Sequence, residues 1–318
     1  MNRWMLLSLL IMLGVIFRIF LFNIFLSPFI MVTVGLLLVF AAGEPVVDGF
    51  KGLAQYTGFP EHVIGIVSSI ASNLPEAVLT LFMIFSPGLR EVAILTVMLA
   101  SAFNGLLLGL LIIMLTFKGG MVELPREVME RDVEIMRITI ILSVMIFGTG
   151  LILNIFHGES NLPFEASIFL LIAYLSYLYF IFRRFKGEVS SEIAVKGWVK
   201  LLILGLIGII VSGDLLSSSL EFFVRKFNVH IVVAATLISF AGSVPEHGIA
   251  IIGVRKGYVE LGVSNLISGI VQSIMLVFPL LALFVPINLD GYILYQFWPL
   301  PPLFGSLRKL SLMMESSL

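Results

Sequence analysis

Cysteine is absent from the 318 residues, and charged residues are scarce. Without thiols the chain forms no disulfide, iron–sulfur cluster or thiolate metal site. Charged residues make up 12% of the chain, about half the share typical of a soluble domain. The net charge of −1 gives no basic field for nucleic acid. A Gly-x-x-x-x-Gly-Lys-Ser/Thr loop is also lacking, which disfavours an ATP-driven pump. We therefore expect no cofactor, nucleotide or nucleic-acid partner.

Apolar residues dominate instead, at 59% of the chain, with a mean hydropathy of +1.11. Runs of about 20 apolar residues, enough to cross a bilayer, lie near 4–24, 29–50, 62–86, 92–117, 136–156, 164–182, 198–220, 230–254 and 258–285. A weaker tenth run, near 289–306, is interrupted by prolines. No small-residue cleavage site follows the first run, so we expect an uncleaved helix there. The sequence predicts an all-α polytopic membrane protein with about ten transmembrane helices and the lipid bilayer as its partner.

Lysine and arginine fall mainly on one side of this ten-span arrangement. Fifteen lie on one side, chiefly in 118–137 and 183–200, and three lie on the other, with Arg18 left inside a span. Because cytoplasmic loops carry the excess of positive charge, we expect both termini in the cytoplasm and the protein in the plasma membrane.

The chain repeats itself weakly at an offset of 170 residues. Residues 71–76 (Ala-Ser-Asn-Leu-Pro-Glu) return as 241–246 (Ala-Gly-Ser-Val-Pro-Glu). The same offset pairs Ser69 with Ser239, and Gly43-Glu44 with Gly213-Asp214. The repeats start five predicted helices apart, an odd number, so the second is inverted relative to the first, as in many transporters. We expect an extra helix in 1–28, a first repeat in 29–186, a cytoplasmic linker in 187–197 and a second repeat in 198–318.

Glu76 and Glu246 lie deep within predicted spans, where a charged carboxylate is costly unless it is paired, protonated or faces water. The proline before each removes a backbone donor and predicts broken helices with exposed carbonyl oxygens. Hydroxyl and amide groups precede both prolines, at Ser69, Ser72, Asn73, Ser239 and Ser243. Such oxygens suit a hard cation, calcium or sodium. The alternative is two ordinary proline kinks, with each glutamate a protonated carboxyl that holds a helix contact.

The helix after each motif supplies further polar groups, namely Asn104 in the first half and Ser264, Asn265, Ser268, Gln272 and Ser273 in the second. Hydrogen bonding between helices is the alternative role for these residues. His247 directly follows Glu246, but neighbouring helical residues point about 100° apart. A bond from His247 to a neighbouring helix is therefore favoured over a proton-carrying role.

The two Pro-Glu motifs, each followed by a helix with a polar patch, resemble the paired alpha-repeats of the calcium/cation antiporter superfamily over roughly 29–285. The resemblance implies a glutamate from each half as central ion ligand, and alternating access that exchanges calcium for sodium or protons. Residues that match the family's motifs are Glu76, Glu246, Ser72, Asn73, Ser243, Asn104 and Ser264-Asn265. Glu246-His247 and Gln272 resemble the calcium/proton branch of the superfamily.

The chain departs from the family pattern at several positions. Gly242 and Ala100 lack the usual hydroxyl, Ser273 stands where Asn or Asp is usual, and the chain after Pro286 is too short for the family's last two helices. Glu44 and Asp214 are acids where exchangers usually carry small or hydroxyl residues. A carboxylate in low-dielectric surroundings binds a proton more readily than in water, so both acids are candidates for lining access paths with protons as counter-ion. The alternative is that both are solvated at the membrane surface.

Secondary cation antiport is thus the first interpretation, with calcium carried and sodium or protons as counter-ion. A transport-inactive membrane scaffold or sensor with an antiporter fold is the second. An intramembrane enzyme with paired acids is the third, and it is less consistent with glutamates beside proline and hydroxyls. We expect no enzymatic activity.

Overall fold

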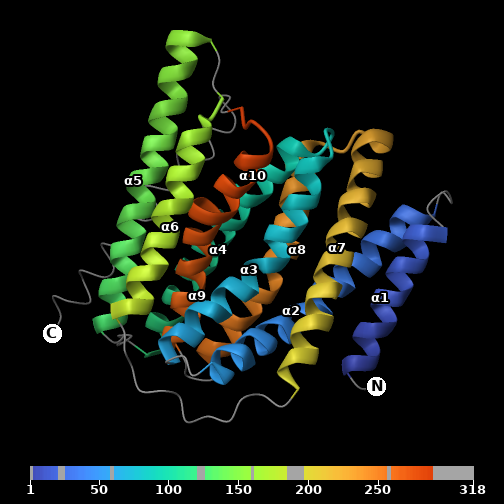
Figure 1. Ribbon diagram of the computed structural model, residues 1–318, viewed down its shortest axis with the longest axis horizontal. Helices are drawn as coiled ribbons and strands as arrows, with labels where there is room; N and C mark the ends of the chain where they lie inside the picture. Colours follow the sequence, from blue (N-terminus) through green and yellow to red (C-terminus); the bar gives the residue numbers. More distant parts are fainter. Residues whose placement is uncertain are drawn as a thin grey trace. The chain divides into compact units, whose positions relative to one another are not determined.

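The computed structural model describes residues 3–20, 26–57, 61–119, 126–158, 161–184, 197–255 and 259–288. The helices are α1 (Arg3–Phe20), α2 (Ser27–Tyr56), α3 (Glu61–Phe85), α4 (Arg90–Gly119), α5 (Arg126–His157), α6 (Phe164–Arg184), α7 (Trp198–Phe227), α8 (Ile231–Arg255), α9 (Val259–Gln272) and α10 (Phe278–Phe284), with a π-helical turn, η1 (Ser273–Val277), before the last (Figure 1). No strand occurs in these ranges beyond one isolated bridge between Asn161 and Asn288. The all-α prediction is confirmed, while the weak tenth run (289–306) and most of the linker (187–197) lie outside the described residues.

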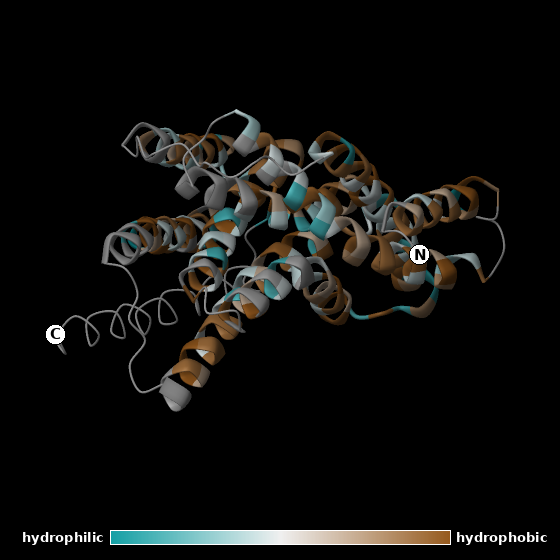
Figure 2. Cartoon of the chain, turned by 90° about the horizontal axis from the view of Figure 1, so that it is seen from below, coloured by the Kyte–Doolittle hydropathy of each residue, from teal (hydrophilic) through white to brown (hydrophobic). Residues whose placement is uncertain are grey.

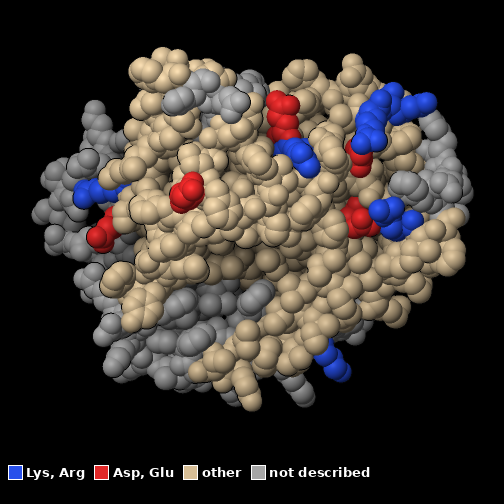
Figure 3. Space-filling model, turned by 45° about the horizontal axis from the view of Figure 1, so that its top comes forward, with Lys and Arg blue, Asp and Glu red and all other residues tan. Residues whose placement is uncertain are grey.

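Five helices in the described ranges contain segments long and apolar enough to cross a membrane, namely Ser27–Gly49, Arg90–Leu115, Glu134–Phe156, Trp198–Phe227 and Gly262–Phe284. Shorter apolar stretches lie in α1, α3, α6 and α8. Large apolar side chains such as Ile19, Phe156 and Phe180 are exposed, and the helices are predominantly hydrophobic along their length (Figure 2). On the face in Figure 3 the charged side chains are few and scattered. Lipid is the solvent that suits such a surface, so the protein is an integral, multi-pass membrane protein.

Two compact units make up the chain, and each combines segments far apart in sequence. The first consists of Met1–Thr96 and Phe180–Glu246, and the second of Val97–Tyr179 and His247–Leu318. Each unit therefore draws on both predicted repeats.

In the first unit α2 and α7 pack closely and run antiparallel. A methyl group on Gly35 would lie 2.8 Å from Leu216 Cγ, and one on Gly49 would lie 2.7 Å from Leu202 Cα. Contact partners thus advance in opposite directions along the two helices. A methyl group on Gly205 of α7 would likewise lie 2.5 Å from Val46 Cγ2. Small residues let helix backbones approach closely in a membrane, where dispersion contacts replace the hydrophobic effect as the driving force.

These contacts follow the 170-residue offset. Gly35 and Gly205 are 170 residues apart, and so are Val46 and Leu216. The contact of Gly35 with Leu216 and the contact of Gly205 with Val46 are therefore the same contact with the two helices exchanged. Equivalent positions of the sequence repeat accordingly occupy equivalent places in the α2–α7 interface.

Helices α1 and α3 pack on this antiparallel pair. A methyl group on Gly14 of α1 would lie 2.8 Å from Leu215 Cδ1 of α7. On α3, Phe82 and Val78 lie against Gly213 of α7, where a methyl group would come within 2.9 Å and 3.3 Å of their side chains. The helix that carries Glu76 is thus held directly against α7.

In the second unit α5 supports the segment that contains α9 and the π-helical turn. Thr139 Oγ1 lies 3.3 Å from Met275 Sδ, and it donates to the Ile135 carbonyl at 2.9 Å. The Leu162 amide donates to the Ile287 carbonyl at 2.8 Å. The predicted span 258–285 is therefore helical, but it contains one turn with wider hydrogen-bond spacing that the sequence pattern did not indicate.

The close approach of α2 and α7 predicts that Gly205→Ala destabilises the protein by about 1–3 kcal/mol, because the new methyl group has no room beside Val46. Gly109→Ala on α4 is the matched control, since no atom lies within 4 Å of its added methyl group. Thermal unfolding in detergent measures both variants. Equal midpoints for the two variants would contradict the packing described here.

Candidate functional site

The motif around Glu76 lies on α3 and is buried. The Glu76 side chain is 1% exposed, and Ser69, Ser72 and Asn73 are buried as well. Ser72 Oγ and Asn73 Nδ2 both donate to the Ser69 carbonyl, at 2.9 Å and 3.2 Å. One turn later Thr80 Oγ1 donates to the Glu76 carbonyl at 2.9 Å. Side-chain donors around Glu76 are thus directed to the backbone of the same helix.

The motif around Glu246 lies on α8 and repeats this arrangement. Glu246 is 0% exposed, and Ser239 and Ser243 are buried. Ser243 Oγ donates to the Ser239 carbonyl at 2.8 Å. This bond is the counterpart of the Asn73 bond to Ser69, because both pairs are separated by 170 residues. The sequence repeat therefore preserves a hydrogen bond as well as residue types.

The expected breaks in these helices are not found. The α3 helix continues through Pro75, and the backbone of α8 is helical on both sides of residue 245. A proline removes a single backbone donor, and the surrounding turns keep their own hydrogen bonds. The Ser72 and Asn73 side chains add bonds to a carbonyl of the preceding turn. The prediction of broken helices at the site is therefore wrong for these two segments.

Helices α3 and α8 meet at the two motifs. A methyl group on Gly242 would lie 3.6 Å from both Cα and Cβ of Glu76, which is ordinary van der Waals contact. Glu246 follows Gly242 by four residues, one helical turn, and so shares the face of α8 that is turned to α3. The structure thus brings together the two motifs, including Glu76, Ser72, Asn73, Glu246 and Ser243, that the sequence analysis paired.

In the second unit Asn104 is fully buried on α4. Its Oδ1 lies 2.8 Å from His247 Nε2. An amide oxygen only accepts hydrogen bonds, so the histidine nitrogen donates in this pair. The expectation that His247 bonds a neighbouring helix is confirmed, and its partner is itself a predicted site residue.

Gln272 and Ser273 are also buried in the second unit. Gln272 Nε2 donates to Ser268 Oγ at 2.8 Å, and the Tyr174 hydroxyl of α6 hydrogen-bonds the Gln272 side chain. Ser273 is the first residue of the π-helical turn, a feature that occurs often at functional sites. Tyr174 was missed in the sequence, where one tyrosine in an apolar helix carries no signal of its partner.

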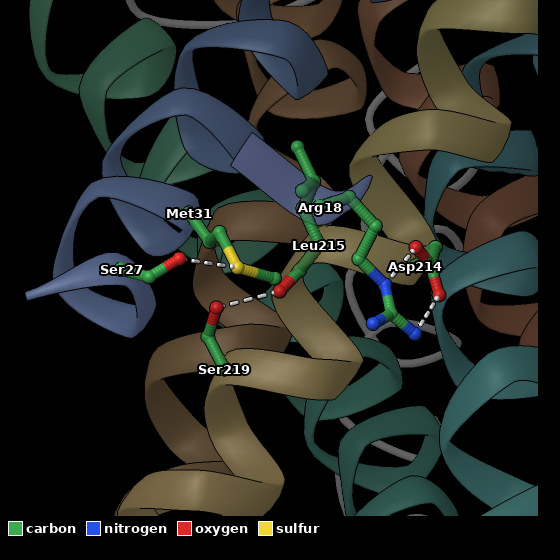
Figure 4. Close-up of polar contacts among 6 residues, drawn as sticks. All are labelled: Arg18, Ser27, Met31, Asp214, Leu215 and Ser219. Carbon is green, nitrogen blue, oxygen red and sulfur yellow. Dashed lines mark hydrogen bonds and ion pairs between the residues drawn. The ribbon is translucent and has the colours of Figure 1, made fainter. Parts of the chain in front are cut away.

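The two repeated Gly-acid positions differ in their surroundings. Glu44 is exposed on α2, whereas Asp214 on α7 forms an ion pair with Arg18 of α1 (Figure 4). The Arg18 Nε and Nη2 atoms donate to the two carboxylate oxygens at 2.7 Å and 3.3 Å. Sequence reasoning left Arg18 as an unexplained charge inside a span. A lone cation and a lone acid in separate apolar helices was the available signal for this pair.

No group of three or more histidine and acidic side chains that suits a metal ion occurs in the described part of the chain. A cation here would depend on the two glutamates together with neutral oxygens, as the sequence analysis expected.

Comparison with known proteins adds the family. The model of the sodium/calcium exchanger protein family matches residues 27–183 and 198–307. Inner membrane protein YrbG of Escherichia coli (strain K12) is 27% identical over 275 residues, which cover 81% of this chain and 80% of that protein. Both matches span the two sequence repeats.

Solved structures share the fold at low sequence identity. The H+/Ca2+ exchanger CAX superposes with a TM-score of 0.73 at 16% identity, over 94% of this chain and 79% of that chain. YfkE gives 0.67 at 16% identity, over 95% and 90%. The sodium-calcium exchanger NCX_Mj gives 0.59 at 19% identity, over 93% and 90%. The superfamily resemblance is confirmed, and this chain belongs to the sodium/calcium exchanger protein family, whose members are membrane cation antiporters and not enzymes.

Proposed function

We propose that this protein exchanges Ca2+ for Na+ or H+ by alternating access, with Glu76 and Glu246 as the central ion ligands. The observation that carries the proposal is the direction of the hydrogen bonds in the two motifs. Ser72, Asn73 and Ser243 each donate to a carbonyl of their own helix. A serine hydroxyl has one proton to donate, so its lone pairs remain for a cation. Oxygen acceptors are thereby concentrated beside two buried carboxylates.

Charge favours a divalent ion at such a site. Two carboxylates neutralise one Ca2+, and oxygen ligands are those that calcium prefers. Each carboxylate alone would be costly at membrane depth, and a shared cation offsets that cost. The titles of two structures with this fold name an H+/Ca2+ exchanger and a sodium-calcium exchanger, which supports calcium as the carried ion.

We extend the ligand set to residues of both units. Ser69 and Ser239 are proposed ligands beside the two glutamates, and Asn104, Gln272 and Ser273 are proposed ligands from the helices that follow. The amide donor of Gln272 is directed to Ser268, which orients its oxygen as the acceptor. Asn104 Oδ1 accepts one bond from His247 and keeps a second lone pair.

The antiparallel packing of α2 and α7 supports an inverted-repeat architecture with about ten helices. The two helices are equivalent in the sequence repeat, and their matched glycine contacts exchange under the 170-residue offset. Equivalent helices that run in opposite directions are what a pseudo-two-fold axis in the membrane plane requires.

Replacing Glu76 or Glu246 with Gln is expected to lower calcium uptake into proteoliposomes by at least roughly a hundredfold, because each lost charge weakens a divalent site strongly. Glutamine keeps the shape and volume, so the unfolding temperature should stay close to that of the unmodified protein. Glu91→Gln, at an exposed acid in the first turn of α4, is the control and should transport normally. Unchanged calcium flux through Glu76→Gln would refute the ligand assignment, and absence of flux in the unmodified protein would favour the scaffold or sensor.

The counter-ion is proposed to include protons, with Glu44 and Asp214 lining the access paths. Gly242 and Ala100 offer no side-chain oxygen for sodium, while both halves carry an additional acid. We expect calcium uptake under an imposed pH gradient without sodium, and a fall in that uptake relative to sodium-driven uptake when Glu44→Gln and Asp214→Asn are combined. Taking the ratio of the two drives removes general effects on turnover. Uptake driven only by a sodium gradient, with an unchanged ratio in the double variant, would exclude protons.

The orientation is proposed from the lysine and arginine bias, with both termini in the cytoplasm and the protein in the plasma membrane. We expect 118–135 and 186–197 inside and 157–163 outside. The chain has no cysteine, so Ser160→Cys and Ser190→Cys each create a single labelling site. A membrane-impermeant maleimide added outside intact cells should label the first and spare the second, and the reverse pattern would overturn the orientation.

A further inference from the structure

The ion pair between Arg18 and Asp214 joins two helices far apart in sequence (Figure 4). Two guanidinium nitrogens face the two carboxylate oxygens, the fork geometry in which arginine binds a carboxylate most specifically. The side chains are 37% and 33% exposed, so neither is sealed in the protein. The carboxylate of Asp214 is thus occupied by a cation that belongs to the chain itself.

Packing keeps this cation in place. Gly14, one turn before Arg18, allows α1 to approach Leu215 of α7 closely. Farther along, Leu7 Cδ1 lies against Gly208 of α7. The match to the family model begins at residue 27, so α1 and its arginine lie outside the matched region. The arginine is therefore a feature of this chain beyond the part that it shares with the family model.

The pair also lies beside the helix that carries a proposed ion ligand. Gly213, adjacent to Asp214, packs against Val78 and Phe82 of α3. Val78 is two residues after Glu76 on that helix. Any net charge left at Asp214 would therefore act on a cation at Glu76 over about one helix diameter.

We propose that Arg18 is a tethered cation that occupies the Asp214 carboxylate and keeps this position electrically neutral, and that it thereby sets the affinity of the proposed site for its cation. The inference rests on the proposed function. Removal of Arg18 leaves a net negative charge beside α3, which strengthens cation binding and opens Asp214 to a second cation. Removal of the carboxylate leaves a net positive charge that weakens binding. Removal of both restores neutrality.

Calcium binding to the purified protein, measured by isothermal titration calorimetry at low ionic strength, tests this charge cycle. Arg18→Gln is expected to tighten calcium binding about fivefold, and Asp214→Asn to weaken it about fivefold, the effect of one charge on a divalent ion over about one helix diameter. The double variant should lie within about twofold of the unmodified protein, since the two charges are removed together. Arg225→Gln is the matched control. It removes the same charge from the exposed end of α7, where salt screens it.

A merely structural ion pair gives a different pattern. In that case both single variants weaken binding and lower the unfolding temperature, and the double variant does not recover, which would overturn the inference. Single variants that bind calcium as the unmodified protein does would also overturn it, while the proposed function stands if Glu76→Gln still abolishes binding. If the unmodified protein binds no calcium, the proposed function fails and the inference fails with it.

Discussion

Hydrogen-bond donors inside a membrane protein must find their partners within the protein, because lipid offers none. In α3 and α8 this requirement is met locally, since Ser72, Asn73 and Ser243 donate to carbonyls of their own helices. The same bonds fix which atoms are left over. Once the protons are directed at the backbone, the exposed sides of these groups are oxygen lone pairs. The constraint that stabilises the helix thereby produces surroundings suited to a cation.

Helix packing imposes the second constraint, and it explains why part of the repeat consists of glycine. Gly35 and Gly205 carry no chemistry, yet each is required where the partner helix approaches to within a methyl group's radius. Their contacts exchange under the same offset that relates Glu76 to Glu246. A weak sequence repeat with few identities is therefore sufficient, because the conserved geometry depends on a small number of close contacts and on the polar motifs.

Much of the fold followed from the sequence, since hydropathy alone located the helices and the Pro-Glu motifs located α3 and α8 as the helices of interest. The continuity of α3 through Pro75 did not follow, because a proline inside a helix is compatible with a break, a kink or an uninterrupted helix, and the neighbouring hydrogen bonds decide among them. The π-helical turn at Ser273 was also hidden, since it changes the hydrogen-bond spacing without changing the apolar pattern. The Arg18–Asp214 pair depends on tertiary packing between residues 196 positions apart, which one sequence does not encode in any local signal.

Not every glycine in the repeat answers to packing, and the exception lies at the site. A methyl group on Gly205 would come within 2.5 Å of Val46 Cγ2, whereas one on Gly242 would lie 3.6 Å from its nearest neighbours in Glu76. Space therefore requires glycine at the first position and tolerates a larger residue at the second. Ser72 stands at the position equivalent to Gly242 in the first repeat, so the two halves present different numbers of oxygens for a reason other than fit. The low oxygen count of the second half is consequently a matter of the site's chemistry, and it belongs with the choice of counter-ion rather than with the stability of the fold.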